Sequence, residues 1–207
     1  MLKAVLLCLL TAVALPAWAT QEYILPTLFD VHGVAADDVL NIRERPDAGS
    51  PIIGSLAPDA TGIEIIETEG NWGLLNTNER TGWVSMRYLR YRTDVWQDDA
   101  VPAGLRCGGN EPFWMIEPRD GGLMWWTPEG EMFYDDLTVL DTGVFRSPRR
   151  ALLASGPEGR LTASITNAAC NDGMSDMRYG LDAIVVRDGE TPRLSTGCCW
   201  IARPAGP

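Results

Sequence analysis

Hydrophobic and polar residues alternate over short stretches along most of this chain, and turn residues separate the stretches. In the first half, the pattern predicts strands at Val39–Ile42, Ile52–Leu56, Ile63–Ile66, Trp72–Leu75, Thr77–Arg80 and Gly82–Val84. The turn clusters Arg45–Ser50 and Glu69–Asn71 lie between them. Strand-sized runs at intervals of about 8–12 residues are typical of an all-β sandwich or small barrel.

The β-pattern resumes in the second half, from Arg106 to Ile201. The predicted strands here are Phe113–Ile116, Leu123–Trp126, Leu137–Leu140, Leu161–Ile165 and Ala183–Val186. A short helix is compatible only with Ser147–Leu153 or with the residues after Cys170. Thr93–Leu105 has weak periodicity and several turn residues, which predicts a linker between two domains.

The first 19 residues have the composition of an export signal. Lys3 precedes an apolar run from Ala4 to Leu15, and Pro16–Ala19 provides a small-residue cleavage site. No later stretch reaches the roughly 20 apolar residues that cross a bilayer. We therefore expect cleavage after Ala19 and a periplasmic or secreted mature chain without a membrane span.

Composition and charge exclude some classes of function. Of 207 residues, 45% are hydrophobic and 22% charged, which suits a folded chain, and the formal net charge is −11. Removing the signal removes Lys3, the only lysine, so Schiff-base chemistry at a lysine is excluded. The acidic balance disfavours nucleic acid as a partner.

Five landmarks in residues 28–92 resemble the bacterial SH3 (SH3b) domain. They are Leu40–Arg43 followed by Pro46, Ile53–Leu56, Asn71–Trp72, Thr81–Ser85 and Tyr88–Leu89. The resemblance implies a small barrel of five or six strands. It also implies a non-catalytic module that attaches envelope proteins to cell-wall material or to another protein.

Three segments of the second half resemble an uncharacterised family of bacterial envelope proteins. They are Cys107–Trp114, which contains Gly-Asn-Glu-Pro-Phe-Trp, Cys170–Asp176, and Gly197–Cys199. The layout is similar to the small β domains of heat-inducible and META-type envelope proteins. The resemblance implies no established activity.

These observations predict an all-β protein with a small SH3-like barrel followed by a second, disulfide-stapled small β-barrel or sandwich. The predicted organisation is a signal peptide (1–19), an N-terminal extension (20–27), the SH3-like barrel (28–92), a linker (93–105), the stapled β domain (106–201) and a C-terminal tail (202–207).

Cleavage also removes Cys8 and leaves Cys107, Cys170, Cys198 and Cys199, an even set that predicts two disulfides in an oxidising compartment. Neighbouring strand residues point to opposite faces, so Cys198 and Cys199 should bond separate partners. One bond should join the first strand of the domain to the last, and the other should tie the Asp172 loop to that last strand. Zinc-knuckle and C-x-x-C redox spacings are absent, so we predict no metal and no cofactor.

Three carboxylates are candidates for catalysis if the disulfides bring them together: Glu111, Asp172 and Asp176. A pair about 5–9 Å apart would suit glycoside hydrolysis. The other interpretation is structural, because Asn171–Gly173 has a turn signature and Glu111 precedes a proline. The single histidine, His32, lies in the other domain, which disfavours Ser-His or Cys-His catalysis.

Aromatic residues are the candidates for ligand binding. Trp72 and Tyr88 in the first domain, and Trp114, Trp125 and Trp126 in the second, are predicted either to stack on a ligand or to pack. Trp125 and Trp126 should face opposite sides of a strand. We therefore expect a non-enzymatic binding protein whose partner is peptidoglycan or an envelope protein. The alternative is an envelope glycan hydrolase with paired carboxylates.

Overall fold

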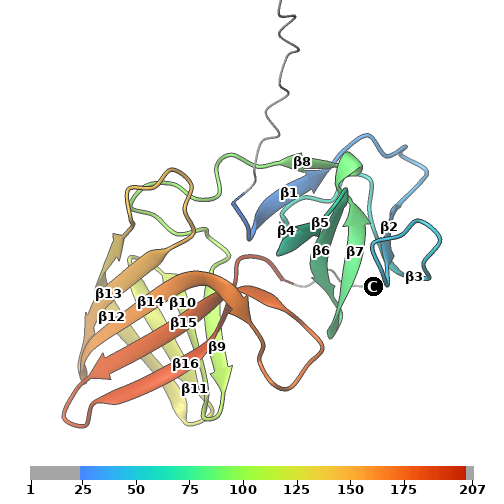
Figure 1. The fold of residues 1–207 in the computed structure, drawn as a ribbon. Coiled ribbons are helices and arrows are strands. Elements are labelled where there is room, and N and C mark those ends of the chain that lie inside the picture. Colours follow the sequence, from blue (N-terminus) through green and yellow to red (C-terminus); the bar gives the residue numbers. More distant parts are fainter. Residues whose placement is uncertain (1–23, 204–207) are drawn as a thin grey trace, which may run out of the picture.

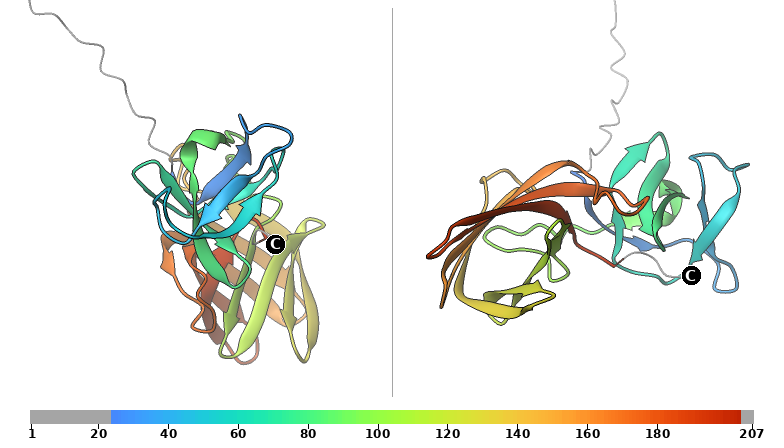
Figure 2. Two further views of the ribbon diagram at one scale, coloured as in Figure 1. Left: turned by 90° about the vertical axis from the view of Figure 1, so that its right-hand side faces the viewer. Right: turned by 90° about the horizontal axis from the view of Figure 1, so that it is seen from below.

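The computed structural model describes residues 24–203, so the predicted signal peptide at 1–19 lies outside the described residues. Within 24–203 the chain is nearly all β-structure, in two groups of strands that lie side by side (Figures 1 and 2). The only helix in this range is a 3-10 turn at Met86–Tyr88. No helix among these residues is long and apolar enough to cross a membrane.

The N-terminal unit contains two antiparallel sheets. Its strands are β1 (Thr27–Val31), β2 (Leu40–Arg43), β3 (Ile52–Leu56), β4 (Ile63–Ile65), β5 (Glu67–Glu69), β6 (Trp72–Thr77), β7 (Arg80–Ser85) and β8 (Leu89–Tyr91). One sheet has the order β4-β1-β8 and the other β3-β2-β7-β6-β5. Phe29, Ile42, Ile65 and Val84 are fully buried between them. Thr77–Arg80, predicted as a strand, is the turn of the β6–β7 hairpin.

The second group forms the C-terminal barrel. Its strands are β9 (Arg106–Asn110), β10 (Phe113–Arg119), β11 (Gly122–Thr127), β12 (Gly130–Leu140), β13 (Arg150–Gly156), β14 (Gly159–Cys170), β15 (Tyr179–Asp188) and β16 (Arg193–Trp200). Each strand pairs with its neighbour in sequence, and β9 also pairs with β16, which closes the sheet. The structure thus decides between barrel and sandwich in favour of a closed barrel.

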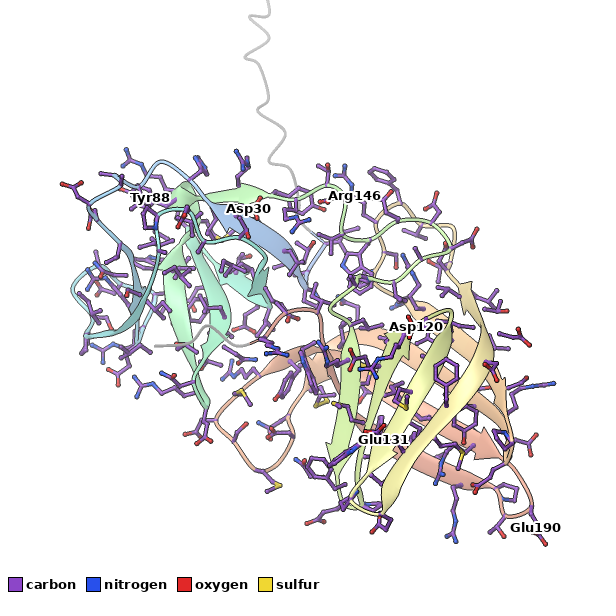
Figure 3. All side chains as sticks on the ribbon, turned by 180° about the vertical axis from the view of Figure 1, so that it is seen from behind. Asp30, Tyr88, Asp120, Glu131, Arg146 and Glu190 are labelled. Atoms are coloured by element: carbon purple, nitrogen blue, oxygen red, sulfur yellow. A yellow bond between two sulfur atoms is a disulfide. The ribbon has the colours of Figure 1, made fainter. Side chains whose placement is uncertain are left out.

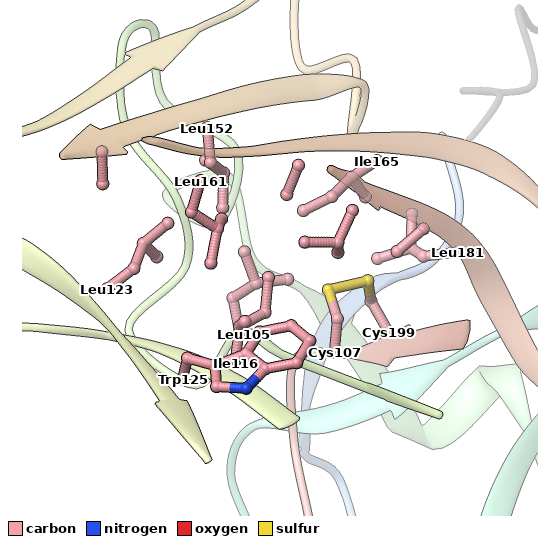
Figure 4. Packing of buried hydrophobic residues seen from close by; sticks show 14 of the residues in the cluster. Leu105, Cys107, Ile116, Leu123, Trp125, Leu152, Leu161, Ile165, Leu181 and Cys199 are labelled. Carbon is pink, nitrogen blue, oxygen red and sulfur yellow. A yellow bond between two sulfur atoms is a disulfide. The ribbon is translucent and has the colours of Figure 1, made fainter. Parts of the chain in front are cut away.

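Alternating side chains fill the barrel interior. Leu161 and Ala163 of β14 and Leu181 and Val185 of β15 have no exposed surface. Figure 4 shows such residues around Trp125 and the buried disulfide. The same alternation overturns the short helix considered at Ser147–Leu153. Leu152 and Ala154 point into the barrel, so these residues belong to β13.

Both predicted disulfides are present, and both reach the last strand. Cys107 of β9 is bonded to Cys199, and Cys170 at the end of β14 is bonded to Cys198. Cys199 has no exposed surface and belongs to the core cluster, whereas Cys198 has the opposite side-chain direction in β16. The two bonds therefore brace the inside and the outside of one strand.

The predicted linker is packed against the barrel. Val95, Trp96 and Leu105 are buried in the barrel's core cluster. The Arg150 guanidinium lies 5.3 Å from the Trp96 ring centre, and its Nε and Nη2 donate to the carbonyl oxygens of Ala100 and Gln97, each at 2.8 Å. An apolar anchor and a cation that binds backbone carbonyls thus hold this segment to the barrel.

Glu64 of β4 joins the two units directly. Its Oε2 accepts hydrogen bonds from the backbone N–H groups of Ile201 and Ala202, at 3.0 and 3.1 Å. Burial raises the pKa of Glu64 to about 7, against the lowering effect of these hydrogen bonds. The junction therefore contains a carboxyl group that titrates near neutral pH.

A second set of contacts connects the β6–β7 hairpin with the segment that precedes β15. The Asn76 Nδ2 donates to the Arg178 carbonyl oxygen at 2.8 Å, and its Oδ1 accepts from the Arg178 N–H at 3.1 Å. The Asp176 N–H donates to the Glu79 carbonyl oxygen at 3.2 Å. These contacts, with those of Glu64 and the linker, set the orientation of the two units.

We expect loss of the core disulfide to destabilise the protein more than loss of the outer one. The two bonds span 92 and 28 residues respectively. By chain entropy, replacing Cys107 and Cys199 with Ala should cost about 4–5 kcal/mol, against about 3–4 kcal/mol for Cys170 and Cys198. Urea unfolding of both double variants measures the difference. Equal or reversed costs would contradict the prediction.

We also expect Glu64→Gln to remove a pH dependence of stability. Because the folded-state pKa is raised, the contribution of Glu64 is fully present below its unfolded value of 4.5 and is lost as pH rises through about 7. Thermal unfolding from pH 4 to pH 8 should therefore show less destabilisation at high pH in the variant. Glu67→Gln, at an exposed ion pair with Arg178, is the control and should follow the unmodified protein.

Candidate binding groove on the outer face of the barrel

An open groove of about 420 Å³ runs over the outer face of β9, β10, β11 and β16. We call it the outer groove, and its apolar lining includes Phe113, Met115, Met124, Trp126, Tyr179 and Trp200, together with Trp114. Glu131 of β12, labelled in Figure 3, lies at its edge. On β10 and β11 the residues of one parity fill the core and those of the other form most of the groove.

Two aromatic pairs form much of the groove wall. The rings of Phe113 and Trp126 meet edge to face with centres 5.6 Å apart, and those of Tyr179 and Trp200 are 5.9 Å apart. Phe113 is 47% exposed, so part of this aromatic surface is open to solvent. Such a surface can stack on a ligand with an apolar face.

Two consecutive glycines of β9 make this arrangement fit. A Cβ on Gly109 would lie 2.4 Å from the Trp114 indole nitrogen, so glycine is needed where the Trp114 ring packs inside the barrel. A Cβ on Gly108 would lie 3.0 Å from the Trp114 carbonyl oxygen and 3.6 Å from the Trp200 ring. The glycine pair thus leaves room for one tryptophan on each side of the sheet.

The Asp172 loop forms one end of the groove. The Asp172 Oδ1 accepts from the N–H groups of Met174 and Ser175, each at 3.0 Å, and Oδ2 accepts from the Ser175 and Tyr179 hydroxyls at 2.8 and 3.3 Å. The Asn110 Nδ2 donates to the Asp172 carbonyl oxygen at 2.7 Å. With the Cys170–Cys198 bond, these contacts bring all three motif segments together.

The electrostatics of the loop follow from these hydrogen bonds. Burial acts to raise the pKa of Asp172, but the hydrogen bonds from Met174, Ser175 and Tyr179 outweigh it and hold the pKa below its usual range. Burial and the neighbouring Asp172 charge raise the pKa of Tyr179 to about 12. Asp172 is therefore an ionised acceptor and Tyr179 a neutral donor at physiological pH.

The three candidate catalytic carboxylates do not share one site. Glu111 is exposed and, with Asp172, lines a neighbouring hollow of about 410 Å³. Asp176 lies instead at the junction with the N-terminal unit, where its backbone forms an isolated β-bridge with that of Arg80. A general acid in glycoside hydrolysis needs a raised pKa, whereas that of Asp172 is lowered. The turn interpretation of Asp172 agrees with its hydrogen bonds.

The predicted ligand-binding aromatics are placed differently from one another. Trp126 lines the outer groove, as the alternation with Trp125 implied. Trp114 and Trp125 are only 1% and 4% exposed, and their rings stack inside the barrel at 5.2 Å, so both belong to the core, although Trp114 also lines the outer groove. Trp72 and Tyr88 are half-buried in the N-terminal unit, and Tyr88 packs against its core.

Sequence reasoning did not select several residues that form the groove. Phe113 and Met115 share the outward parity of β10, and Trp200 follows the same parity as Cys198 in β16. This alternation along the strands was the sequence signal that could have identified these groove residues. It needed the knowledge that β9 and β16 pair, because only this pairing places Trp200 beside Gly108.

The part of the chain that the structure describes contains no free thiol. The four cysteines there are all in disulfides. No group of three His, Cys, Asp or Glu side chains within residues 24–203 is arranged to hold a metal ion.

Comparison with known proteins concerns the N-terminal unit. Residues 38–90 match the family model of the bacterial SH3 domain, which confirms that part of the predicted resemblance. The resemblance of the second domain and its motifs stays a prediction. Comparison with curated proteins and with solved structures finds no match. The family model thus places a bacterial SH3 domain at residues 38–90, beside an eight-stranded barrel that carries the outer groove.

Proposed function

We propose that this chain is an exported, non-enzymatic binding protein of the bacterial cell envelope. The SH3 domain attaches it to cell-wall material or to an envelope protein, and the barrel presents the outer groove to a ligand with an apolar face. The observation that carries the proposal is the convergence of the three motif segments on an open aromatic surface.

The chemistry of the groove supports binding rather than catalysis. Its apolar wall includes two aromatic pairs, and the Asp172 carboxylate at its end accepts four hydrogen bonds. Asp172 is a poor proton donor, since its pKa is lowered. Apolar surface with a few fixed polar groups is typical of small-molecule sites. A sugar ring has a flat apolar face that suits these rings.

Export is supported by the chain's cysteine use. Three of the four bonded cysteines are buried, and disulfides persist in oxidising compartments such as the periplasm. The leader-like residues 1–19 predict the same route. The proposed location is therefore periplasmic or extracellular.

Wall attachment is tested by co-sedimentation of the mature chain with purified peptidoglycan. The chain and the wall are both acidic, so charge alone would keep them apart. We expect retention above that of an acidic control protein, and retention that persists or increases as salt screens the repulsion. Retention equal to the control at every salt concentration would remove the wall-binding part of the proposal.

Ligand binding in the groove is tested by tryptophan fluorescence. Titration of the mature chain with soluble peptidoglycan fragments should change its emission, because Trp126 and Trp200 both line the groove, and Trp200 remains as a reporter in the variant below. Replacing both Phe113 and Trp126 with Leu should weaken binding about tenfold or more, given about 1–3 kcal/mol for a lost stacking contact. Phe145→Leu, at a 73% exposed ring outside the groove, is the control. Equal affinities of the two variants would exclude the groove as the binding site.

A further inference from the structure

A second, polar pocket lies at the end of the barrel that is remote from the N-terminal unit. It has a volume of about 740 Å³ and lies between the β13–β14 and β15–β16 turns. Glu190, which lines it, marks this far end in Figure 3. Its polar lining includes Tyr134, Glu158, Arg187, Glu190 and Arg193. None of these residues contributes to the outer groove.

Arg187 points into the barrel. Leu181, Ala183 and Val185 of the same strand have no exposed surface, whereas Ile184 and Val186 are exposed, so Arg187 has the inward parity. Its guanidinium carbon lies 4.3 Å from the centre of the buried Trp125 ring. The charged Arg187 side chain thus points to the same side of β15 as the buried apolar residues Leu181, Ala183 and Val185.

The Arg187 charge is incompletely satisfied among the described residues. Its Nε is buried and has no hydrogen-bond partner there. The ion pairs found within residues 24–203 involve Arg90, Arg92, Arg106 and Arg178, and neither Arg187 nor Arg193 takes part in one. A buried donor without a partner costs about 1–3 kcal/mol, and more when it is charged. This cost in the unliganded protein calls for a functional reason.

Arg193 adds a second cation on the same side of the sheet. Arg187 and Arg193 are direct partners in the β15–β16 register, so their side chains leave the same face. Like charges directly opposite one another destabilise a strand pair, and an anion between them would offset this repulsion. A guanidinium group can bind a carboxylate or phosphate through two parallel hydrogen bonds, and this pocket contains two such groups.

The other groups at the pocket narrow the choice of anion. Burial raises the pKa of Tyr134, although the Arg187 charge and a hydrogen bond with Arg187 oppose this, so the phenol remains a neutral donor. Glu158 and Glu190 at the rim would repel a dianionic phosphate and attract an ammonium group. Two arginines and two glutamates at one pocket therefore favour a zwitterionic ligand, which has one carboxylate and one ammonium group.

We propose that this end of the barrel is a second binding site, in which Arg187 and Arg193 hold the carboxylate of a small zwitterion such as an amino acid or short peptide. Tyr134 donates to the same carboxylate, and the rim acids Glu158 and Glu190 face the ammonium group. Neither the SH3 domain nor the outer groove takes part. The site therefore stands whether or not the proposed wall attachment holds.

Calorimetric titration of the mature chain with three probes tests the site. The probes are the dipeptide alanyl-alanine, propionate and inorganic phosphate. We expect the dipeptide to bind best and phosphate worst. Arg187→Met should weaken dipeptide binding at least about tenfold, because hydrogen bonds to a charged group are lost. Arg149→Met removes the same charge from an exposed position next to the other end of β13 and should bind like the unmodified protein.

A stability measurement separates a binding role from a structural one. In a buffer without carboxylate or phosphate, Arg187→Met should unfold at the same or a higher temperature than the unmodified chain, because it removes an unpaired buried donor. A lower unfolding temperature would show that Arg187 is a structural group and would overturn the proposal. So would equal affinity of the unmodified chain and Arg187→Met for the dipeptide, or tighter binding of phosphate than of the dipeptide.

Discussion

Two adjacent residues of one strand, Cys198 and Cys199, hold both the core and the outer surface of the C-terminal barrel. Because strand side chains alternate, Cys199 points inward and bonds Cys107, where the first and last strands of the barrel meet. Cys198 points to the other face and bonds Cys170, which positions the Asp172 loop beside the groove. Barrel closure and groove geometry therefore depend on the same short segment of β16.

Specific contacts hold the N-terminal unit and the barrel in a fixed relative orientation, so the segment between them does not act as a flexible linker. Trp96 is buried in the barrel core, and Arg150 binds the backbone of the same segment. Glu64 accepts two backbone hydrogen bonds from the chain just after β16. A surface bound by the SH3 domain would thus lie in a set orientation to the barrel. The two proposed sites of the barrel differ in chemistry: an aromatic groove on its side, and a cationic pocket at its far end.

Much of the architecture was accessible from local patterns. The SH3-like landmarks, most strands and the separate partners of Cys198 and Cys199 follow from turn residues and from period-two alternation, which are properties of neighbouring residues. The residues of the binding groove were harder to predict from the sequence than the architecture. Trp125 was predicted to bind a ligand but is buried in the core, where Trp114 stacks on it while also lining the groove. Phe113 and Trp200, which were not selected, lie in the groove. Alternation separates the two faces of a strand without saying which face is buried.

The sequence by itself determined an all-β chain, its SH3 landmarks and the separate partners of Cys198 and Cys199, because these depend on residue type and short-range spacing. Only the tertiary structure decided that β9 pairs with β16 and that Arg187 points into the barrel opposite Arg193. It also decided that the Asp172 carboxylate accepts hydrogen bonds within its own turn. Those features depend on register and closure between strands far apart in the chain. Many pairings satisfy the same local pattern, and only the packing of the whole barrel selects one.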